Sequence, residues 1–300
     1  MMLKKTSDEV SPILLDVGGT FIKCGDGREV PVDSGGSRES ITASLRKAVG
    51  NLKAGDCVAV AIPGAFDYDN GIFLMKHKFA SVYGCRFSDM VLEGTGLTEH
   101  DVEFRFIHDV NCMLLGEIVS GAAAGRGNTA LVTLGTGLGF SMYVDGNILE
   151  NAMKSPLVSI YNLPYGDGIL EDYVSKRGIV SGYLRHGGEC GTEALTVKKI
   201  AEMARSGDGA AAAAFSSAGQ ILGEVLSPVL GKYGIRCLLF GGQISRSFDL
   251  MEDALEKSLH DVPELVCTGP VSDFGNATFN GLRQLLKKFL HYPINQLNLR

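Results

Sequence analysis

The sequence has no tryptophan, no closely spaced pair of cysteines and no long apolar run. Its seven cysteines are far apart and odd in number, which favours reduced thiols over a disulfide framework. No stretch approaches the ~18 consecutive apolar residues of a membrane span. The first eleven residues also lack the apolar segment of a secretory signal, so we expect a soluble, cytoplasmic protein.

An excess of positive charge is missing as well. The chain has 28 Lys and Arg against 34 Asp and Glu, a net charge of −6, which argues against nucleic acid as a partner. The composition, 45% apolar and 21% charged, is that of an ordinary globular protein. Because a single core stops growing at roughly 250 to 300 residues, the 300-residue chain is predicted to fold as two lobes.

The first part of the chain has the order of an α/β unit. Residues 12–36 predict strand, turn, strand, turn, strand, and residues 37–53 predict a helix with one apolar stripe. The continuous apolar run before Pro63-Gly64 is typical of a strand buried on both faces. A further strand at 103–110 leads into a helix at 111–125, so Asp109 is expected where a strand ends and a helix begins.

A second cycle begins with strand, glycine-rich turn, strand, turn and strand over residues 128–149. The remaining predicted elements are helices at 192–206, 209–233, 249–259 and 278–290 and a strand at 235–242. The two cycles indicate an internal duplication, and the cleft between two such halves is the natural ligand site.

Glycine-rich turns stand at the start of each cycle. In the first, Gly18-Gly19 follows Asp16, and close backbone approach there could present N–H groups to a phosphate, with Asp16 holding a magnesium ion. Taken alone, such a pair of glycines is more often only a tight turn.

Two further turns strengthen the functional reading. Residues 134–139 have the spacing G-x-G-x-G between two strands, which excludes a dinucleotide site, because that needs G-x-G-x-x-G opening a helix. The third turn, Gly241-Gly242, ends a buried strand where a purine or ribose could lie against bare backbone.

Together, the segments DVGGTFIK, IHDVN, GAAAGRGNTALVTLGTGLGF and LLFGGQIS resemble the ROK family of sugar kinases and related repressors. The resemblance implies an α/β, duplicated ribonuclease-H-like (actin-like ATPase) two-lobe fold with an interlobe cleft. The lobes are predicted at 12–117 and 118–290, and the helix at 278–290 could pack back on the N-terminal lobe.

The same resemblance implies the site residues. Asp109 corresponds to the general base, and Asp16 to the ligand of the magnesium ion that accompanies ATP. The expected ATP and phosphate residues are Gly18, Gly19, Thr20, Lys23, Thr133, Gly135, Thr136, Gly137, Gly241 and Gly242. The expected sugar-binding residues are Pro63, Gly64, Asp67, His108, Asp109 and Glu171.

One carboxylate is enough for this chemistry, because phosphoryl transfer depends mainly on alignment and on neutralising charge. For Asp109 the alternative is a purely structural N-cap of the following helix. Glu171 could likewise be a solvated helix residue rather than a sugar ligand.

The sequence departs from the family pattern at one motif. Relatives carry Glu-x-Gly-His, and the glutamate and histidine positions here hold Val158 and Tyr161. The cysteines that bind zinc in relatives are also missing, so we expect no zinc site. His108 stands where relatives usually have asparagine beside the base.

A basic loop, Lys76-His77-Lys78, is a further candidate. It could line the mouth of the cleft and attract an anionic substrate or product, or it could be a solvated loop with Phe79 packed inward.

The predicted function is an ATP-dependent kinase for a hexose or amino sugar. The alternative is a catalytically weak or inactive ROK-type sensor of sugar or nucleotide without a DNA-binding domain. The expected partner is a small sugar, with no nucleic acid and no membrane, and the resemblance is compatible with a homodimer.

Overall fold

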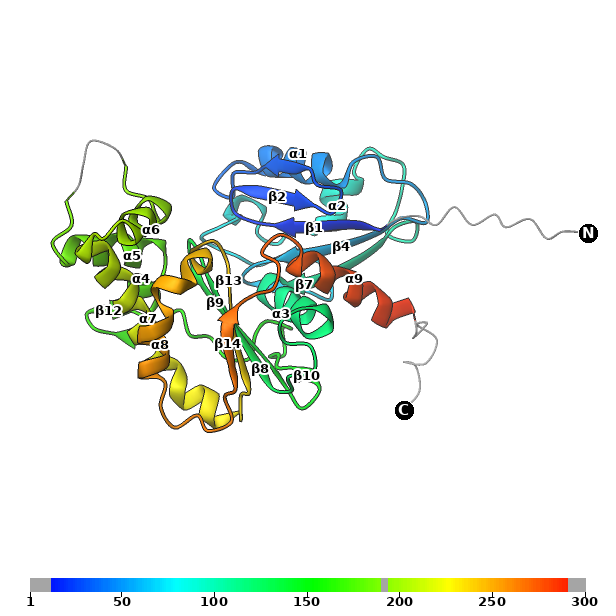
Figure 1. Cartoon of the computed structure of the whole chain (residues 1–300). Helices are drawn as coiled ribbons and strands as arrows, with labels where there is room; N and C mark the ends of the chain where they lie inside the picture. Colours follow the sequence, from blue (N-terminus) through cyan, green and yellow to red (C-terminus); the bar gives the residue numbers. More distant parts are fainter. Residues whose placement is uncertain (1–11, 190–193, 291–300) are drawn as a thin grey trace, which may run out of the picture. The chain divides into compact units, whose positions relative to one another are not determined.

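The computed structural model of the chain describes residues 12–189 and 194–290. These residues form two compact units (Figure 1). Of the described residues, unit 1 contains 12–112, the short segment Ala152–Ser155 and 281–290. Unit 2 contains Met113–Asn151 and Pro156–Asn280.

The core of unit 1 is a five-stranded sheet in the order β3-β2-β1-β4-β7. β1 pairs antiparallel with β2 and parallel with β4, and β4 pairs parallel with β7. The strands predicted from the apolar runs are therefore confirmed. Their bounds are Ile13–Val17 for β1, Phe21–Cys24 for β2, Glu29–Pro31 for β3, Cys57–Ile62 for β4 and Glu103–His108 for β7.

Helix α1, Arg38–Val49, packs against the antiparallel part of this sheet. Ser37 caps its N-terminus by accepting a hydrogen bond from the backbone of Ser40, and its apolar stripe is buried as predicted. A cluster of phenylalanines fills the space beyond, around the hairpin that β5 (Phe66–Asp67) forms with β6 (Ile72–Phe73). The 3₁₀ turn Ala80–Val82 and helix α2, Phe87–Leu92, complete this part of unit 1.

Unit 2 repeats the same sheet, in the order β10-β9-β8-β13-β14. As in unit 1, a three-strand antiparallel run is followed by two strands added in parallel. The shared order confirms the duplication predicted from the glycine-rich turns. The bounds are Thr129–Leu134 for β8, Leu138–Val144 for β9, Asn147–Ile148 for β10, Cys237–Gly241 for β13 and Cys267–Pro270 for β14.

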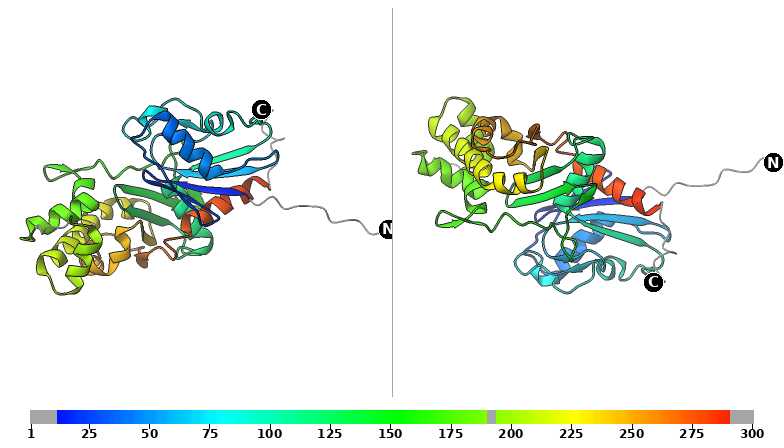
Figure 2. Two further views of the ribbon diagram at one scale, coloured as in Figure 1. Left: turned by 90° about the horizontal axis from the view of Figure 1, so that it is seen from above. Right: turned by 90° about the horizontal axis from the view of Figure 1, so that it is seen from below.

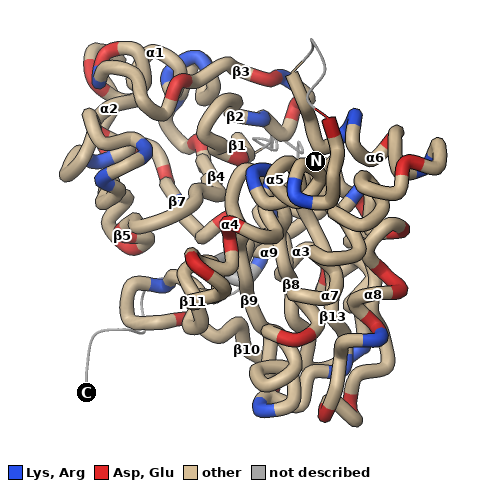
Figure 3. The backbone as a smooth tube through the Cα atoms, turned by 90° about the vertical axis from the view of Figure 1, so that its left-hand side faces the viewer, with Lys and Arg blue, Asp and Glu red and all other residues tan. Residues whose placement is uncertain are grey.

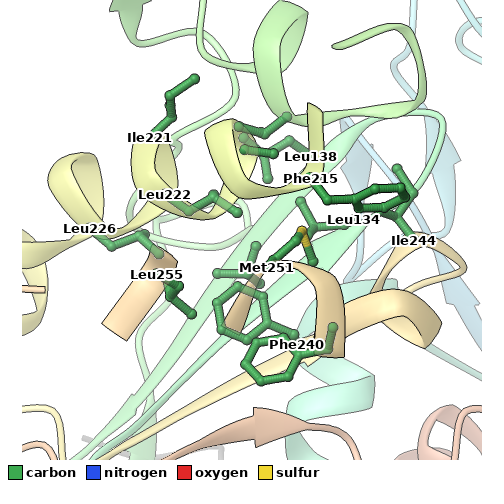
Figure 4. Close-up of a cluster of buried hydrophobic side chains, with 14 of the residues drawn as sticks. Leu134, Leu138, Phe215, Ile221, Leu222, Leu226, Phe240, Ile244, Met251 and Leu255 are labelled. Atoms are coloured by element: carbon green, nitrogen blue, oxygen red, sulfur yellow. The ribbon is translucent and has the colours of Figure 1, made fainter. Parts of the chain in front are cut away.

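Helices cover the unit 2 sheet, and the longest is α7, Gly209–Lys232, which packs against α4 to α6 and α8 (Figure 2). Figure 4 shows side chains from α7, β13 and α8 meeting in one buried cluster, among them Leu222, Phe240 and Leu255. The other helices are α4 (Glu171–Val174), α5 (Lys176–Arg185), α6 (Val197–Arg205) and α8 (Glu252–Ser258).

The remaining elements are α3 (Asp109–Ser120), α9 (Ala277–Leu290), the 3₁₀ segment Ile244–Leu250 and the two-stranded hairpin of β11 (Pro164–Tyr165) with β12 (Gly168–Ile169). Several predicted bounds change. The helix predicted at 192–206 is α6, which begins at Val197, and positions 192 and 193 lie outside the described residues. Helices α2, α4 and α5 were not predicted, because they are short or begin without a capping side chain. Within residues 12–189 and 194–290, no helix has both the length and the apolar character to cross a membrane.

Candidate active site

The candidate residues of unit 1 gather at one edge of its sheet. β1, β4 and β7 are parallel neighbours, so their carboxyl ends meet at the same edge. Asp16 is paired with Ala61 of β4, and Ile62 of β4 is paired with His108 of β7. The structure thus brings the ends of these strands together, with Asp16, Pro63, Gly64, His108 and Asp109 at or just beyond them.

Asp109 is the first residue of α3, directly after β7. Its side chain is 39% exposed. The backbone N–H of Val110 donates to Asp109 Oδ1 (2.7 Å), and Nδ1 of His108 lies 2.9 Å from the same oxygen. No hydrogen bond to Oδ2 occurs in the described part of the chain. One carboxylate oxygen is thus held and the other is open, as a general base requires.

Electrostatics keep Asp109 ionised. Burial acts to raise the pKa of this carboxyl, but His108 and the Val110 N–H, with a smaller effect from Lys78, lower it below its usual value. The ring of His108 is mostly buried and packs at a tilt on Tyr68, with 5.9 Å between the ring centroids. His108 therefore orients the carboxylate as well as acting on its charge.

Asp16 lies on β1 near the same edge of the sheet. Its partner on the antiparallel neighbour β2 is Lys23. In Figure 3 an acidic band on β1 lies next to a basic band on β2. Burial and the nearby Asp109 raise the pKa of Asp16 to about 6, against the opposite effect of Lys23. A partly buried carboxylate that is costly to ionise is suited to a cation, and carboxylate oxygen is a ligand that Mg²⁺ prefers.

The first turn needs glycine because a side chain would not fit there, and not because of its backbone conformation. Neither Gly18 nor Gly19 has a positive φ, so this turn does not use glycine's conformational freedom. A Cβ on Gly18 would lie 2.9 Å from the carbonyl oxygen of Phe21, and one on Gly19 would lie 3.3 Å from Ser34 Oγ. The backbone here is closely packed on one side, while Thr20 is exposed.

Two predicted sugar residues have identifiable structural contacts. Gly64 has a φ of +77°, and its carbonyl accepts a hydrogen bond from the Tyr68 hydroxyl (3.0 Å). Asp67 accepts hydrogen bonds from Asn70 and from the backbone of Asp69, which closes the turn of the β5–β6 hairpin and lowers the pKa of Asp67. The contacts of Asp67 in the structure therefore belong to its own turn.

In unit 2, the second and third glycine turns lie side by side. Thr133 of β8 is paired with Gly241 of β13. A Cβ on Gly242, which has a φ of +84°, would lie 2.3 Å from the carbonyl oxygen of Leu134. At Gly135, in contrast, the position of a Cβ is open. Thr136 is exposed and Gly137 is partly buried in the same turn. Close packing at Gly242 and open space at Gly135 together suit a loop that binds phosphate through its backbone N–H groups.

Glu171 belongs to unit 2 and holds this second turn. Its Oε2 accepts a hydrogen bond from the backbone of Leu138 (2.9 Å), and its Oε1 pairs with Arg177 (2.9 Å). A Cβ on Gly137 would lie 2.9 Å from the same carboxylate. The predicted sugar ligand thus has a second role as the support of the turn.

Residues 176 and 177 were not singled out from the sequence. The backbone N–H of Lys176 donates to the carbonyl of Gly135 (2.8 Å), and Arg177 pairs with both Glu171 and Asp172. Helix α5 therefore begins at the second glycine turn. The signal that could have located it is Ser175, a residue type that often begins a helix.

Uncharged side chains occupy the two altered positions of the Glu-x-Gly-His motif. Val158 packs against the core of unit 2, while Tyr161 is 47% exposed and its carbonyl accepts a hydrogen bond from the backbone of Glu171 (3.0 Å). Among the residues that the structure describes, no group of three or more His, Cys, Asp and Glu side chains could hold a metal ion. A Mg²⁺ bound with a nucleotide needs fewer protein ligands, because phosphate oxygens and water supply the others.

Comparison with known proteins identifies the fold. The chain has the duplicated ribonuclease-H-like, actin-like two-lobe fold: it matches a ROK family glucokinase from Streptomyces griseus, solved with glucose and AMPPNP, at a TM-score of 0.75 and 20% identity, over 93% of this chain and 99% of that one. A ROK family transcriptional regulator, a homologue of the E. coli MLC protein, matches at a TM-score of 0.70 and 17% identity, over 92% of this chain and 77% of that one. An enzyme and a regulator therefore share this architecture.

Sequence similarity points to the same group of proteins. The ROK family model matches residues 15–152, and the glucokinase of Halalkalibacterium halodurans is 25% identical over 280 residues, 79% of this chain and 81% of that protein. These matches agree with the resemblance to the ROK family that the motifs carry.

Proposed function

We propose that this protein is an ATP-dependent sugar kinase that phosphorylates a hydroxyl of a hexose or amino sugar. The observation that carries the proposal is the half-open carboxylate of Asp109, held through one oxygen at the start of α3. The glucokinases among its relatives support the same reaction type.

In this reaction the sugar hydroxyl attacks the γ-phosphorus of ATP, and its proton passes to Oδ2 of Asp109. The bond between the γ-phosphorus and the bridging oxygen breaks, and its electron pair leaves with ADP. His108 and the Val110 N–H bind the other oxygen of Asp109, so they fix the direction in which the base points.

The glycine turns fit the phosphates of ATP. Gly18, Gly19 and Thr20, with Lys23, are proposed to contact phosphate in unit 1. In unit 2, the second turn is proposed to do so through Thr133, Gly135, Thr136 and Gly137, and the third turn, Gly241 and Gly242, to receive the adenosine. The open position at Gly135 supports the assignment of the second turn.

Asp16 would hold the Mg²⁺ that accompanies ATP. Bound there, the ion would neutralise part of the negative charge of the phosphates. A cation also removes the repulsion between Asp16 and Asp109 that raises the pKa of Asp16. Pro63, Gly64, Asp67, His108 and Glu171 remain the proposed sugar contacts.

The alternative, a sensor that binds sugar or nucleotide without turnover, is favoured by one observation. The Glu-x-Gly-His positions hold Val158 and Tyr161, which cannot replace a carboxylate that binds sugar hydroxyls and an imidazole that binds zinc.

The deciding experiment couples ADP release to a spectroscopic signal across a panel of hexoses and N-acetylated sugars. Asp109→Asn should lower kcat about 10²- to 10⁴-fold, because it removes the general base but keeps the shape. Asp26→Asn, at an exposed carboxylate that pairs with Arg28, is the matched control and should keep full activity. Sugar binding by the wild type with no turnover on any sugar would favour the sensor.

A further inference from the structure

Lys78 is a partly buried lysine at the candidate site for which the proposed mechanism has no role so far. Within the described residues its ammonium group makes no hydrogen bond and no ion pair, whereas Lys76 and His77 beside it are exposed. Lys76 lies over the ring of Tyr83, 5.8 Å from its centroid. Lys78 is therefore the cation of this loop that lacks a partner of its own.

The backbone next to Lys78 is held in place. Phe79 is completely buried and packs on Phe73, with 5.7 Å between the ring centroids. It adopts a left-handed conformation with a φ of +53°, which costs energy in a bulky residue and persists only where packing enforces it. A partly buried cation on such a fixed loop is not a solvated surface group.

The loop is also tied to the first glycine turn. The N–H of Phe79 donates to the carbonyl of Ser34 (2.6 Å), and the N–H of Ser34 donates to the carbonyl of Gly19 (3.1 Å). The hydroxyl of Ser81 donates to the carbonyl of Gly36 (2.7 Å). These bonds join the loop of Lys78 to the turn that is proposed to contact phosphate.

Lys78 also acts on the proposed base, because its charge contributes to lowering the pKa of Asp109. The groups that lower the pKa of Asp109 together with Lys78 are the ring of His108 and the backbone N–H of Val110. A phosphoryl group that is transferred to a hydroxyl bound at Asp109 would also interact with the positive charge of Lys78.

We propose that Lys78 binds the phosphoryl group during its transfer, next to Asp109. The assignment rests on the proposed function. As the bond from the γ-phosphorus to the bridging oxygen breaks and the bond to the sugar oxygen forms, negative charge is spread over the peripheral phosphoryl oxygens, and Lys78 stabilises it. The connection through Ser34 to the Gly19 turn favours this role over recognition of a negatively charged sugar.

Lys78→Met keeps the length of the side chain and removes its charge. We expect kcat to fall about 10²- to 10³-fold with the KM for sugar changed less than about threefold, since the interaction strengthens in the transition state. Lys78→Arg should recover part of kcat. Lys76→Met, in the same loop, is the matched control and should leave kcat unchanged. Circular dichroism and the thermal midpoint establish that each variant is folded.

Other outcomes overturn the assignment. An unchanged kcat in Lys78→Met would make the residue a surface lysine, and a higher KM for sugar at constant kcat would make it a contact of the acceptor. If the wild type turns over no sugar, the proposed function fails, and Lys78 is then tested with inorganic phosphate at constant ionic strength. Phosphate should raise the thermal midpoint of the wild type but not of Lys78→Met, and equal shifts would refute the anion site.

Discussion

At the scale of single residues, the pKa values of the two aspartates of the site are shifted in opposite directions. The pKa of Asp109 is lowered, so its ionised form is stabilised by the fold, whereas the pKa of Asp16 is raised to about 6. The difference has a physical cause: burial and the charge of Asp109 disfavour ionised Asp16, whereas His108 and a backbone N–H outweigh the effect of burial at Asp109. Asp16 therefore destabilises the ligand-free protein at neutral pH.

Asp16→Asn should stabilise the protein in the absence of Mg²⁺, while it lowers kinase activity. An unfolded aspartate has a pKa near 3.8, so stability of the wild type falls as the pH rises from about 4 to 6 and Asp16 ionises. Since the side chain is partly exposed, we expect a gain of about 1 to 2 kcal/mol for the variant at pH 7.5 and roughly a third of that gain at pH 4.5. Urea unfolding at both pH values measures it, and an equal difference at the two pH values would contradict it.

The sequence predicted the placement of Asp109 well, because a buried apolar strand followed by helical spacing locates the junction between them. It could not predict the contacts of Asp67 and Glu171. Both are carboxylates in matching positions of the family pattern, but the bonds of Asp67 to Asn70 and of Glu171 to Leu138 depend on how a short hairpin and a later helix fold back.

At the scale of elements, the strands with continuous apolar runs were predictable, and the short helices were not. β4 and β8 are buried along nearly their whole length, which the sequence displays directly. Helices α4 and α5 come after the segment where the sequence departs from the family pattern, and their starts have no side-chain cap. Their position depends on contacts with α7 and with the second glycine turn, which lie far away in sequence.

Substitutions in the second and third turns should distinguish a glycine needed for stability, Gly242, from one needed for function, Gly135. Gly242→Ala should lower stability by about 2 to 4 kcal/mol, because its φ is positive and a Cβ would collide with the Leu134 carbonyl. Gly135→Ala should change stability by less than about 1 kcal/mol, because its Cβ position is open.

Kinetics distinguish the two roles further. If the open space at Gly135 receives phosphate, the added methyl group of Gly135→Ala should raise the KM for ATP about tenfold, which is a loss of roughly 1.4 kcal/mol of binding. Thermal unfolding and initial rates at varied ATP measure both properties. An unchanged KM for ATP in the folded variant would remove Gly135 from the proposed phosphate site.

At the scale of the whole molecule, the duplication was predictable because each cycle repeats the order of strand and turn. The division into units was less accessible, since it falls within α3, after Cys112, and within α9, before Gly281. No change of composition marks either point. Instead the two helices approach closely there: a Cβ on Gly281 would lie 1.9 Å from the carbonyl oxygen of Cys112.

This close approach predicts a sensitive position far from the glycine turns in sequence. Gly281→Ala should lower stability by about 2 to 4 kcal/mol, because the obstacle is helix backbone that cannot rotate away. Gly209→Ala, at the exposed first residue of α7 where a Cβ meets nothing, is the control and should be neutral or slightly stabilising. Because Asp109 lies in the same helix as Cys112, one turn earlier, displaced packing at Gly281 should also lower kcat. A Gly281→Ala protein with the thermal midpoint and the kcat of the wild type would refute this account of how α3 and α9 pack.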